Sequence, residues 1–449
     1  MDNKIKPREQ WGSKIGFTLA AVGSAVGLGN IWRFPTRVGD NGGAAYLFVY
    51  LIIIALIGVT VMLAELTIGR KTQLNPVGAF RALSKKWTFV GAMGVLAGFV
   101  ILSFYSVVGG WTIGYIVRSL TGQFSGDTTE LFLGLITNPG EPLLWHAVFM
   151  ALTIGIVFFG IKGGIEKASK ILMPALFIML ILVIIRSLTL EGAGAGLSFY
   201  LKPDFSEITL STVVAAIGQA FFSLSLGMGA MITYGSYLNK EENLIKSAAI
   251  IPALDTFIAF IAGLAILPAV FAMGVAPNEG AGLAFMTLPG VFAQMPLGGF
   301  FGFLFFVLLF FAALTSAISL LEVVVSFVVD QLKWTRAKAT TIMGAIIFVL
   351  GAFCSLSYAD AKIADVFIWA GEPLFDLMDK LGEYLLVIGA LLTSIFVGWA
   401  WKTENALQEI TNGGKFKFGL AKVWSVLIKY VVPVILVIVF FTYFGFLEI

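Results

Sequence analysis

The residues best suited to chemistry lie at an interruption in the first apolar stretch, which reads GSAVGLGNIWRFP from Gly23 to Pro35. Gly23, Gly27 and Gly29 lower helix propensity and leave the backbone bare, at a depth where each backbone group needs a partner. An unwound turn there exposes carbonyl oxygens that can bind a cation, and the restarting helix exposes amide groups that can bind an anion. The alternative is that these glycines only allow close helix packing, since Gly23 and Gly27 form a GxxxG pair.

A second interruption runs from Gln219 to Gly229, reads QAFFSLSLGMG, and lies five apolar stretches later. Its serines alone are a weak signal, because hydroxyls in membrane helices often bond to their own backbone carbonyls. Its position is stronger, since paired broken helices in corresponding halves of a chain are typical of transporters built from inverted repeats. The two interruptions together favour a binding site near the middle of the membrane.

Other polar side chains also fall within apolar stretches, where an ionisable group needs compensation. Asp255 lies in IIPALDTFIAFIAG, and its carboxylate predicts a cation partner, with sodium the natural one if a backbone break supplies more oxygens. Local capping or pairing near a helix end is the alternative. Thr315 and Ser316 place adjacent hydroxyls in a later stretch, and with carbonyls they form an all-oxygen site suited to a hard cation.

Two pairs of opposite charge lie near the ends of these stretches and suggest gates. Arg33, at the outer end of the first span, complements Asp379 at the start of the tenth, although Asp376 competes for the same role. Arg8 and Asp330 are complementary at the inner surface. One pair at each surface suits a protein with two alternating gates.

The composition predicts that membrane-spanning helices position these residues. The chain has 449 residues, of which 59% are hydrophobic and 12% are charged, and its mean hydropathy is +0.95. These values predict an all-α polytopic membrane protein with about eleven spans of roughly 20 apolar residues each. The expected spans are 13–37, 43–69, 88–121, 144–160, 168–187, 210–238, 243–272, 299–330, 337–355, 375–400 and 424–446.

Several function classes find little support. The net charge of +3 gives no case for nucleic-acid binding. The single Cys354 excludes an intrachain disulfide and a thiolate metal cluster, and the lone His146 argues against a histidine metal site. A membrane-embedded enzyme is poorly supported, since the chain has no HExxH motif.

Alternate connections between the expected spans are rich in lysine and arginine, beginning with the N-terminal segment. The intervening connections are poor in them, and 122–143 and 274–298 contain none. The positive-inside rule therefore predicts a cytoplasmic N-terminus, and an odd number of spans places Ile449 outside. The apolar loop 274–298 is expected to form short helices that fold over the outer face as a lid.

The chain closely resembles the neurotransmitter:sodium symporters, in their bacterial amino-acid-transporting branch with the LeuT-type fold, which includes multi-hydrophobic amino-acid transporters. The resemblance runs from about Gln10 to the end of the eleventh span. It is carried by GSAVGLGNIWRFP, by NGGAA with Glu65 and Gly69-Arg70, by KGGIEKASKILMP, by GQAFFSLSLGMGAMITYGSY and by FFAALTS. It implies one transporter domain over 1–449, with five-helix inverted repeats at about 10–187 and 208–400, broken helices one and six, and an extra helix at 424–446.

The resemblance also implies two sodium sites at the breaks. The first would use the Ala25 carbonyl, Asn30, Ser223, Asp255 and the carboxylate of the substrate. The second would use the Gly23, Val26 and Ala312 carbonyls with Thr315 and Ser316.

An amino-acid substrate would lie beside these sites. Its carboxylate would meet the Leu28 and Gly29 amides and the Tyr105 hydroxyl, and its ammonium group the Ala25, Phe222 and Ser223 carbonyls and the Ser225 hydroxyl. Its side chain would lie among Ile101, Tyr105, Phe222, Met228, Ser316 and Leu320. The family's gates match Arg33 and Asp379 outside and Arg8, Trp11, Tyr237 and Asp330 inside.

Departures from the family pattern refine the expected substrate. Gly27 stands where monoamine transporters carry an aspartate, which favours a substrate with its own carboxylate. Asp255 supplies a negative charge that chloride supplies in animal members, and Ala259 lacks a hydroxyl for chloride, so chloride independence is expected. Met228 replaces a familiar phenylalanine and is flexible enough for larger side chains.

These features predict sodium-coupled import of neutral, hydrophobic or aromatic L-amino acids by alternating access across the inner membrane of a bacterial cell. Three alternatives stay open. An ion channel would need a continuous pore, and a sensor would bind an amino acid without moving it. Proton coupling at Asp255 would replace sodium as the driving ion. The oligomeric state is not predicted.

Overall fold

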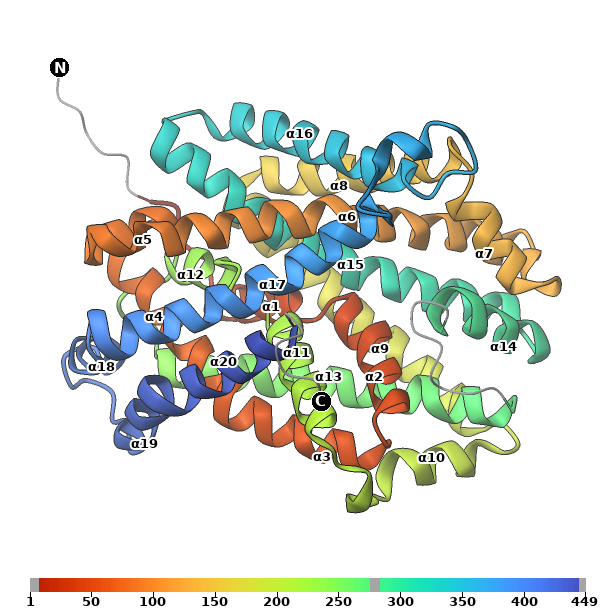
Figure 1. Cartoon of the computed structure of the whole chain (residues 1–449), viewed down its shortest axis with the longest axis horizontal. Helices are drawn as coiled ribbons and strands as arrows, with labels where there is room; N and C mark the ends of the chain where they lie inside the picture. The colour runs from red at the N-terminus through yellow and green to blue at the C-terminus, as the bar shows by residue number, and fades with distance from the viewer. Residues whose placement is uncertain (1–7, 275–282, 444–449) are drawn as a thin grey trace.

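The apolar stretches of the chain form long helices that run alongside one another in the computed structural model (Figure 1). The structure describes residues 8–274 and 283–443. In this part of the chain, nine helices are long and apolar enough to cross a membrane, and a bent helix pair forms a tenth span. The chain is therefore a multi-pass helical membrane protein.

Each of the nine unbroken spans is a continuous run of one or two α-helices, in places with a π-helical or 3₁₀ segment. They are α3 (Ala44–Ile53) with η2 (Ile54–Gly58) and α4 (Val59–Thr72), η3 (Lys85–Trp87) with α6 (Thr88–Leu120), α8 (Glu141–Phe158), η5 (Ile161–Glu166) with α9 (Lys167–Leu188), α13 (Leu244–Ala272), α15 (Gly298–Leu332), α16 (Arg336–Leu356), α17 (Leu374–Ile395) with η9 (Phe396–Ala400), and α19 (Ala421–Val426) with η10 (Leu427–Val431) and α20 (Val432–Tyr443).

The first span is broken, as the glycines predict. Helix α1 (Lys14–Ala25) is capped at its start by Ser13, whose hydroxyl accepts a hydrogen bond from the Gly16 amide. The chain then leaves the helix and restarts as η1 (Gly29–Arg33) and α2 (Phe34–Asp40), at an angle of 53° to α1. The interruption falls inside the motif that the sequence analysis singled out.

The sixth predicted span is broken more severely. Helix α11 (Leu210–Ser223) and helix α12 (Ala230–Gly235) are separated by non-helical residues. Gly227 and Gly229 there have φ angles of +83° and +75°, which glycine adopts without strain. Neither half is long enough to span a membrane alone, which is why ten spans satisfy the length criterion where about eleven are predicted. The last predicted span extends to residue 446, outside the described residues.

Short elements connect the spans. They are α5 (Pro76–Leu83), η4 (Gln123–Ser125), α7 (Thr128–Ile136), α10 (Ala193–Leu201), η6 (Phe205–Glu207), η7 (Leu283–Thr287), α14 (Leu288–Gln294), η8 (Ala364–Phe367), the antiparallel strands β1 (Ile368–Trp369) and β2 (Glu372–Pro373), and α18 (Thr403–Ile410). The predicted lid segment forms η7 and α14 in its second half, whereas residues 275–282 lie outside the described part.

Packing places the two breaks at the centre of the helices. Figure 1 shows α6 crossing the molecule, with α8 and α16 along one side and α17 along the other, and α15 also packs along it. Helix α1 packs against α9, α13 and α15, so its broken end is surrounded by other spans. The broken helix ends are therefore surrounded by protein and not by lipid, where their free backbone groups would find no hydrogen-bond partners.

A buried cluster of charged residues joins the end of α4 to α18, on the side of the molecule where Arg8 lies. Arg70 is fully buried, and its Nε donates to Glu409 Oε1 of α18 at 2.9 Å. Lys240 Nζ, in the connection between α12 and α13, donates to the same oxygen at 2.9 Å. Burial acts to raise the pKa of Glu409, but Lys240 and Arg70 outweigh it and hold that pKa below its ordinary value.

We expect Glu409→Gln to destabilise the detergent-solubilised protein by about 3 kcal/mol, because it leaves Arg70 buried without its carboxylate. A thermal melt measures this loss. Because the folded-state pKa is lowered, the stabilisation is complete above the unfolded pKa of about 4.3 and is lost as the pH falls through the lower, folded value. Glu241→Gln is the control, since its pair with Lys415 is exposed and contributes little. Equal melting temperatures for Glu409→Gln and Glu241→Gln would contradict this stabilising role of Glu409.

Candidate functional site

The two broken spans contact each other at their interruptions. Gln219 of α11 donates from Nε2 to the carbonyl of Gly29 at 2.8 Å. Ser225, in the second break, donates from its hydroxyl to the carbonyl of Ser24 at 2.7 Å. On the other side of the second break, the Gly227 amide donates to Glu65 of α4 at 2.7 Å. Side chains thus satisfy backbone groups that the helix breaks release.

The first cluster suited to a cation brings together Asn30, Ser223 and Asp255. Asn30 Nδ2 and Ser223 Oγ each donate to a different carboxylate oxygen of Asp255 at 2.8 Å. Asp255 is fully buried, and the described residues supply it with neutral hydrogen-bond donors but no basic side chain. A buried carboxylate without a counter-charge is costly, so the cluster favours a bound cation.

The second cluster surrounds Thr315 and Ser316 of α15. Ser316 Oγ lies 3.5 Å from the Val26 carbonyl oxygen, and Thr315 Oγ1 lies 3.0 Å from the Ala312 carbonyl oxygen. Gly23 is close as well, because a Cβ placed there would lie 3.2 Å from Thr315 Cβ. The donor set consists of hydroxyl and carbonyl oxygens alone, which suits a hard cation such as sodium. Among the described residues, no three acidic, histidine or cysteine side chains form a metal-binding group.

A small cavity of about 20 Å³ lies between the breaks. Nine of the eleven residues predicted to contact an amino acid line it: Ala25, Gly29, Ile101, Tyr105, Phe222, Ser225, Met228, Ser316 and Leu320. Of the other two, Leu28 lines a neighbouring cavity and Ser223 bonds to Asp255. Ser24 and Gly27 also line the small cavity and were not predicted, although they belong to the same glycine-rich motif.

Groups suited to an anion and groups suited to a cation both lie beside this cavity. The Leu28 amide donates to the Tyr105 hydroxyl at 3.1 Å, so a single carboxylate can contact both groups. Ser225 and the Ser24 carbonyl offer oxygens to a positive group. At Gly27 a Cβ would lie 2.5 Å from Ser316 Oγ and 2.7 Å from Tyr105 Oη, so no larger side chain fits there without displacing them.

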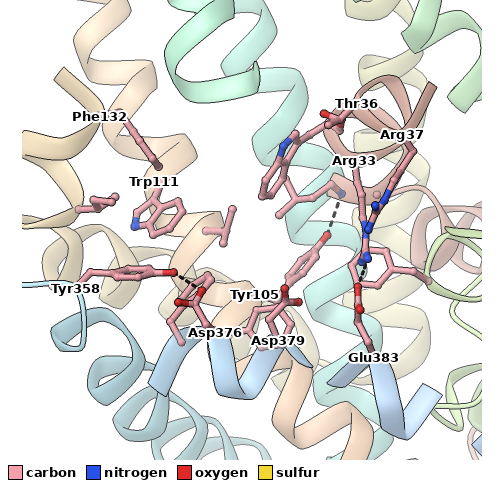
Figure 2. Close-up of a pocket in the computed structure, with 18 of the residues that line it drawn as sticks. Arg33, Thr36, Arg37, Tyr105, Trp111, Phe132, Tyr358, Asp376, Asp379 and Glu383 are labelled. Carbon is pink, nitrogen blue, oxygen red and sulfur yellow. Dashed lines mark hydrogen bonds and ion pairs between the residues drawn. The ribbon is translucent and has the colours of Figure 1, made fainter. Parts of the chain in front are cut away.

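A larger cavity of about 500 Å³ adjoins the small one on the Arg33 side. Gly29, Tyr105 and Phe222 line both cavities, so they form the boundary between them. Arg33 stacks over the Phe222 ring at 4.7 Å, a cation–π contact. Figure 2 shows Arg33 and Arg37 beside this cavity, with Arg33 joined to Glu383, and Asp376 and Asp379 on the same helix as Glu383, α17.

The sequence pairs Arg33 with Asp379, whereas the structure places its ion pair one turn further along α17. Arg33 forms its ion pair with Glu383 (Figure 2). Asp379 and Glu383 are four residues apart on α17 and therefore share a helix face, so both carboxylates line the cavity and the guanidinium contacts the farther one. The competing Asp376 instead accepts a hydrogen bond from Tyr358 at 2.6 Å.

On the opposite side, the predicted Arg8 and Asp330 are in contact. Arg8 Nη1 donates to Asp330 at 2.5 Å, and Arg8 also stacks over the Tyr237 ring. The Trp11 amide donates to the Tyr237 carbonyl at 3.3 Å. The Tyr237 hydroxyl donates to Glu322 at 2.5 Å.

A second ion pair joins this network and was missed by the sequence analysis. Glu322 is fully buried in α15 and pairs with Arg336 at the start of α16. The two residues are 14 positions apart, Glu322 within α15 and Arg336 at the start of α16. A buried glutamate in an apolar stretch was the signal that could have found them. The network ties the N-terminal segment to α12, α15 and α16.

The fold and the site together define a sodium-dependent membrane transporter, and comparisons with known proteins identify its family. A sodium:neurotransmitter symporter family model matches residues 8–132 and 130–447, so the chain belongs to this family. An uncharacterized sodium-dependent transporter of Bacillus subtilis, YhdH, is 41% identical over 446 residues, covering 98% of each chain. One from Haemophilus influenzae is 39% identical over 459 residues, covering 98% of this chain and 99% of the other.

A solved structure agrees with the fold. MhsT, crystallised in complex with L-phenylalanine, is 47% identical and superposes with a TM-score of 0.88 over 97% of this chain and all of the other. The LeuT-type fold predicted from the sequence is therefore confirmed.

We expect sodium, but not potassium, to raise the melting temperature of the purified protein, because a ligand that binds only the folded state stabilises it. In Asp255→Asn the sodium concentration for half of this shift should rise by at least about tenfold, or ~1.4 kcal/mol, since the cluster loses its charge. Asp376→Asn is the control, because Asp376 lies on the larger cavity and bonds to Tyr358. An unchanged midpoint in Asp255→Asn would exclude this carboxylate from sodium binding.

Proposed function

We propose that this protein is a sodium-coupled symporter that imports neutral, hydrophobic or aromatic L-amino acids by alternating access. One observation carries the proposal: the break in the first span contacts the Asp255 cluster through Asn30 and also lines a small cavity of mixed polar and apolar groups. The substrate's carboxylate can then contact the Leu28 amide and Tyr105 while it completes the first sodium site.

Two sodium ions fit the two oxygen clusters. The first would bind at the Ala25 carbonyl, Asn30, Ser223 and Asp255, and the second at Thr315, Ser316 and the carbonyls of Gly23, Val26 and Ala312. Each sodium ion that crosses 100 mV and a tenfold gradient releases about 3.7 kcal/mol. Two ions together would supply roughly 7 kcal/mol, which supports a substrate gradient of about 10⁵.

The pocket favours a neutral amino acid. Its lining combines the apolar Ile101, Phe222, Met228 and Leu320 with hydroxyl groups, and it offers no charged side chain to a substrate side chain. The structure of MhsT with L-phenylalanine adds a relative of similar fold that binds an aromatic amino acid. Gly27 leaves no carboxylate to replace one missing from an amine, which favours α-amino acids over amines.

The two ends of the molecule support alternating access, with the Arg33 side outward and the N-terminus cytoplasmic. The larger cavity reaches the small one from the Arg33 side, whereas Arg8, Trp11, Tyr237 and Asp330 are joined by contacts on the other. In the proposed cycle, Phe222 and Tyr105 close over the substrate, Arg33 and the α17 carboxylates seal the outer side, and the inner contacts then open. The two five-helix repeats are part of this proposal.

The decisive experiment is uptake of labelled leucine and tryptophan into proteoliposomes under inward sodium, potassium or proton gradients. We expect accumulation above the outside concentration with sodium alone, and at least a tenfold loss of it in Asp255→Asn, because the sodium site loses its charge. Sodium-dependent binding without accumulation would identify a sensor instead. Accumulation driven by protons alone would contradict the two-sodium mechanism, and sodium current without substrate would favour a channel.

Chloride independence follows from the fixed charge of Asp255, which supplies the negative charge beside the first sodium site. Ala259, one turn further along α13, offers no hydroxyl to an anion. We expect sodium-driven uptake to be unchanged when gluconate replaces all chloride, as measured by initial rates. A loss of more than tenfold in gluconate would contradict this part of the proposal.

A further inference from the structure

A glycine behind the pocket wall limits the position of one lining side chain. Gly382 lies on the buried face of α17, which packs along α6. A Cβ placed on Gly382 would lie 2.9 Å from Cγ1 of Ile101 and 3.4 Å from Cε1 of Phe104. The first distance is shorter than carbon atoms tolerate, so Ile101 occupies space that any other residue at position 382 would take.

Ile101 is the side chain that transmits this constraint to the site. It lines the small cavity and is otherwise enclosed, with an exposed fraction of 2%. Membrane-protein interiors are as closely packed as other protein interiors, and a displaced side chain moves toward the nearest free volume. For Ile101 that volume is the cavity itself. A methyl group at position 382 would therefore push Ile101 into the pocket.

We propose that Gly382, which does not line the pocket, determines how large a substrate side chain the pocket accepts. The inference rests on the proposed function and deepens it, since it concerns neutral amino acids in the same site. The absent side chain lets Ile101 lie back against α17, and this leaves room for large apolar or aromatic substrates. Glu383, the partner of Arg33, is the next residue of α17 after Gly382. One turn of α17 therefore supports Ile101 from behind and also carries the carboxylate of the Arg33 ion pair.

The test compares Gly382→Ala with the wild type in sodium-driven uptake of alanine, leucine, phenylalanine and tryptophan. Losing about one methyl group of space in an apolar pocket costs at least about tenfold in specificity for the substrate that needs that space. We expect kcat/KM for tryptophan and phenylalanine to fall about tenfold or more, and that for alanine to change less than threefold. Uptake of leucine should fall between these limits.

Two further variants separate this effect from a general loss of packing. Gly98→Ala makes the same substitution on α6 one turn before Ile101, where a Cβ meets its nearest neighbours, Leu320 and Val323, at 3.5 and 3.6 Å, which is ordinary contact. It should leave the order of substrates unchanged. Ile101→Ala removes Cγ1, the atom that a Cβ at position 382 would meet at 2.9 Å, so adding it to Gly382→Ala should restore most of the tryptophan uptake.

An equal loss for all four amino acids, or no loss, in Gly382→Ala would overturn the inference. If Gly382→Ala alone does not fold, the double variant with Ile101→Ala relieves the clash and is compared with Ile101→Ala alone. A lower preference for tryptophan in the double variant would then overturn the inference, because no Ile101 Cγ1 remains to be displaced. Failure of the proposed function gives a different result, because the wild type itself would then accumulate none of the four amino acids in a sodium gradient.

Discussion

The whole site depends on the rule that backbone polar groups within a membrane need partners. Two spans are not helical throughout, so some of their backbone groups lose their helical partners. Side chains from other spans replace those partners: Gln219 bonds to the Gly29 carbonyl, Ser225 to the Ser24 carbonyl, and Glu65 to the Gly227 amide. The same geometry leaves oxygens and amides directed into one small volume.

The two ends of the molecule differ in how they are closed. On the Arg33 side, carboxylates of α17 line an open cavity of about 500 Å³, and Arg33 contacts Glu383 while Asp379 lies one turn away. On the Arg8 side, ion pairs and aromatic contacts connect the N-terminal segment, Tyr237 after α12, and helices α15 and α16. In the proposed orientation, with the Arg33 side outward, this difference suits an outward-facing state in which ligand binding drives the inward opening.

Much of this arrangement could be predicted from the sequence, because glycine, serine and carboxylate residues within apolar stretches have few structural explanations. Both breaks and the grouping of Asn30, Ser223 and Asp255 followed from residue type and from the family resemblance. The ion-pair partner of Arg33 did not, because Asp379 and Glu383 lie one turn apart on the same face of α17 and line the same cavity. Gly382 gave no signal at all, since its effect comes from a missing side chain in the second layer around the pocket.

The central claim is that sodium and an amino acid occupy one shared site, with the substrate carboxylate completing the sodium shell. Equilibrium binding of labelled phenylalanine to the purified protein tests it most directly, at several sodium concentrations with potassium as replacement. Sharing a site predicts that the Kd for phenylalanine falls as sodium rises, and that phenylalanine tightens sodium binding by the same factor. Equal Kd values in sodium and in potassium would contradict it.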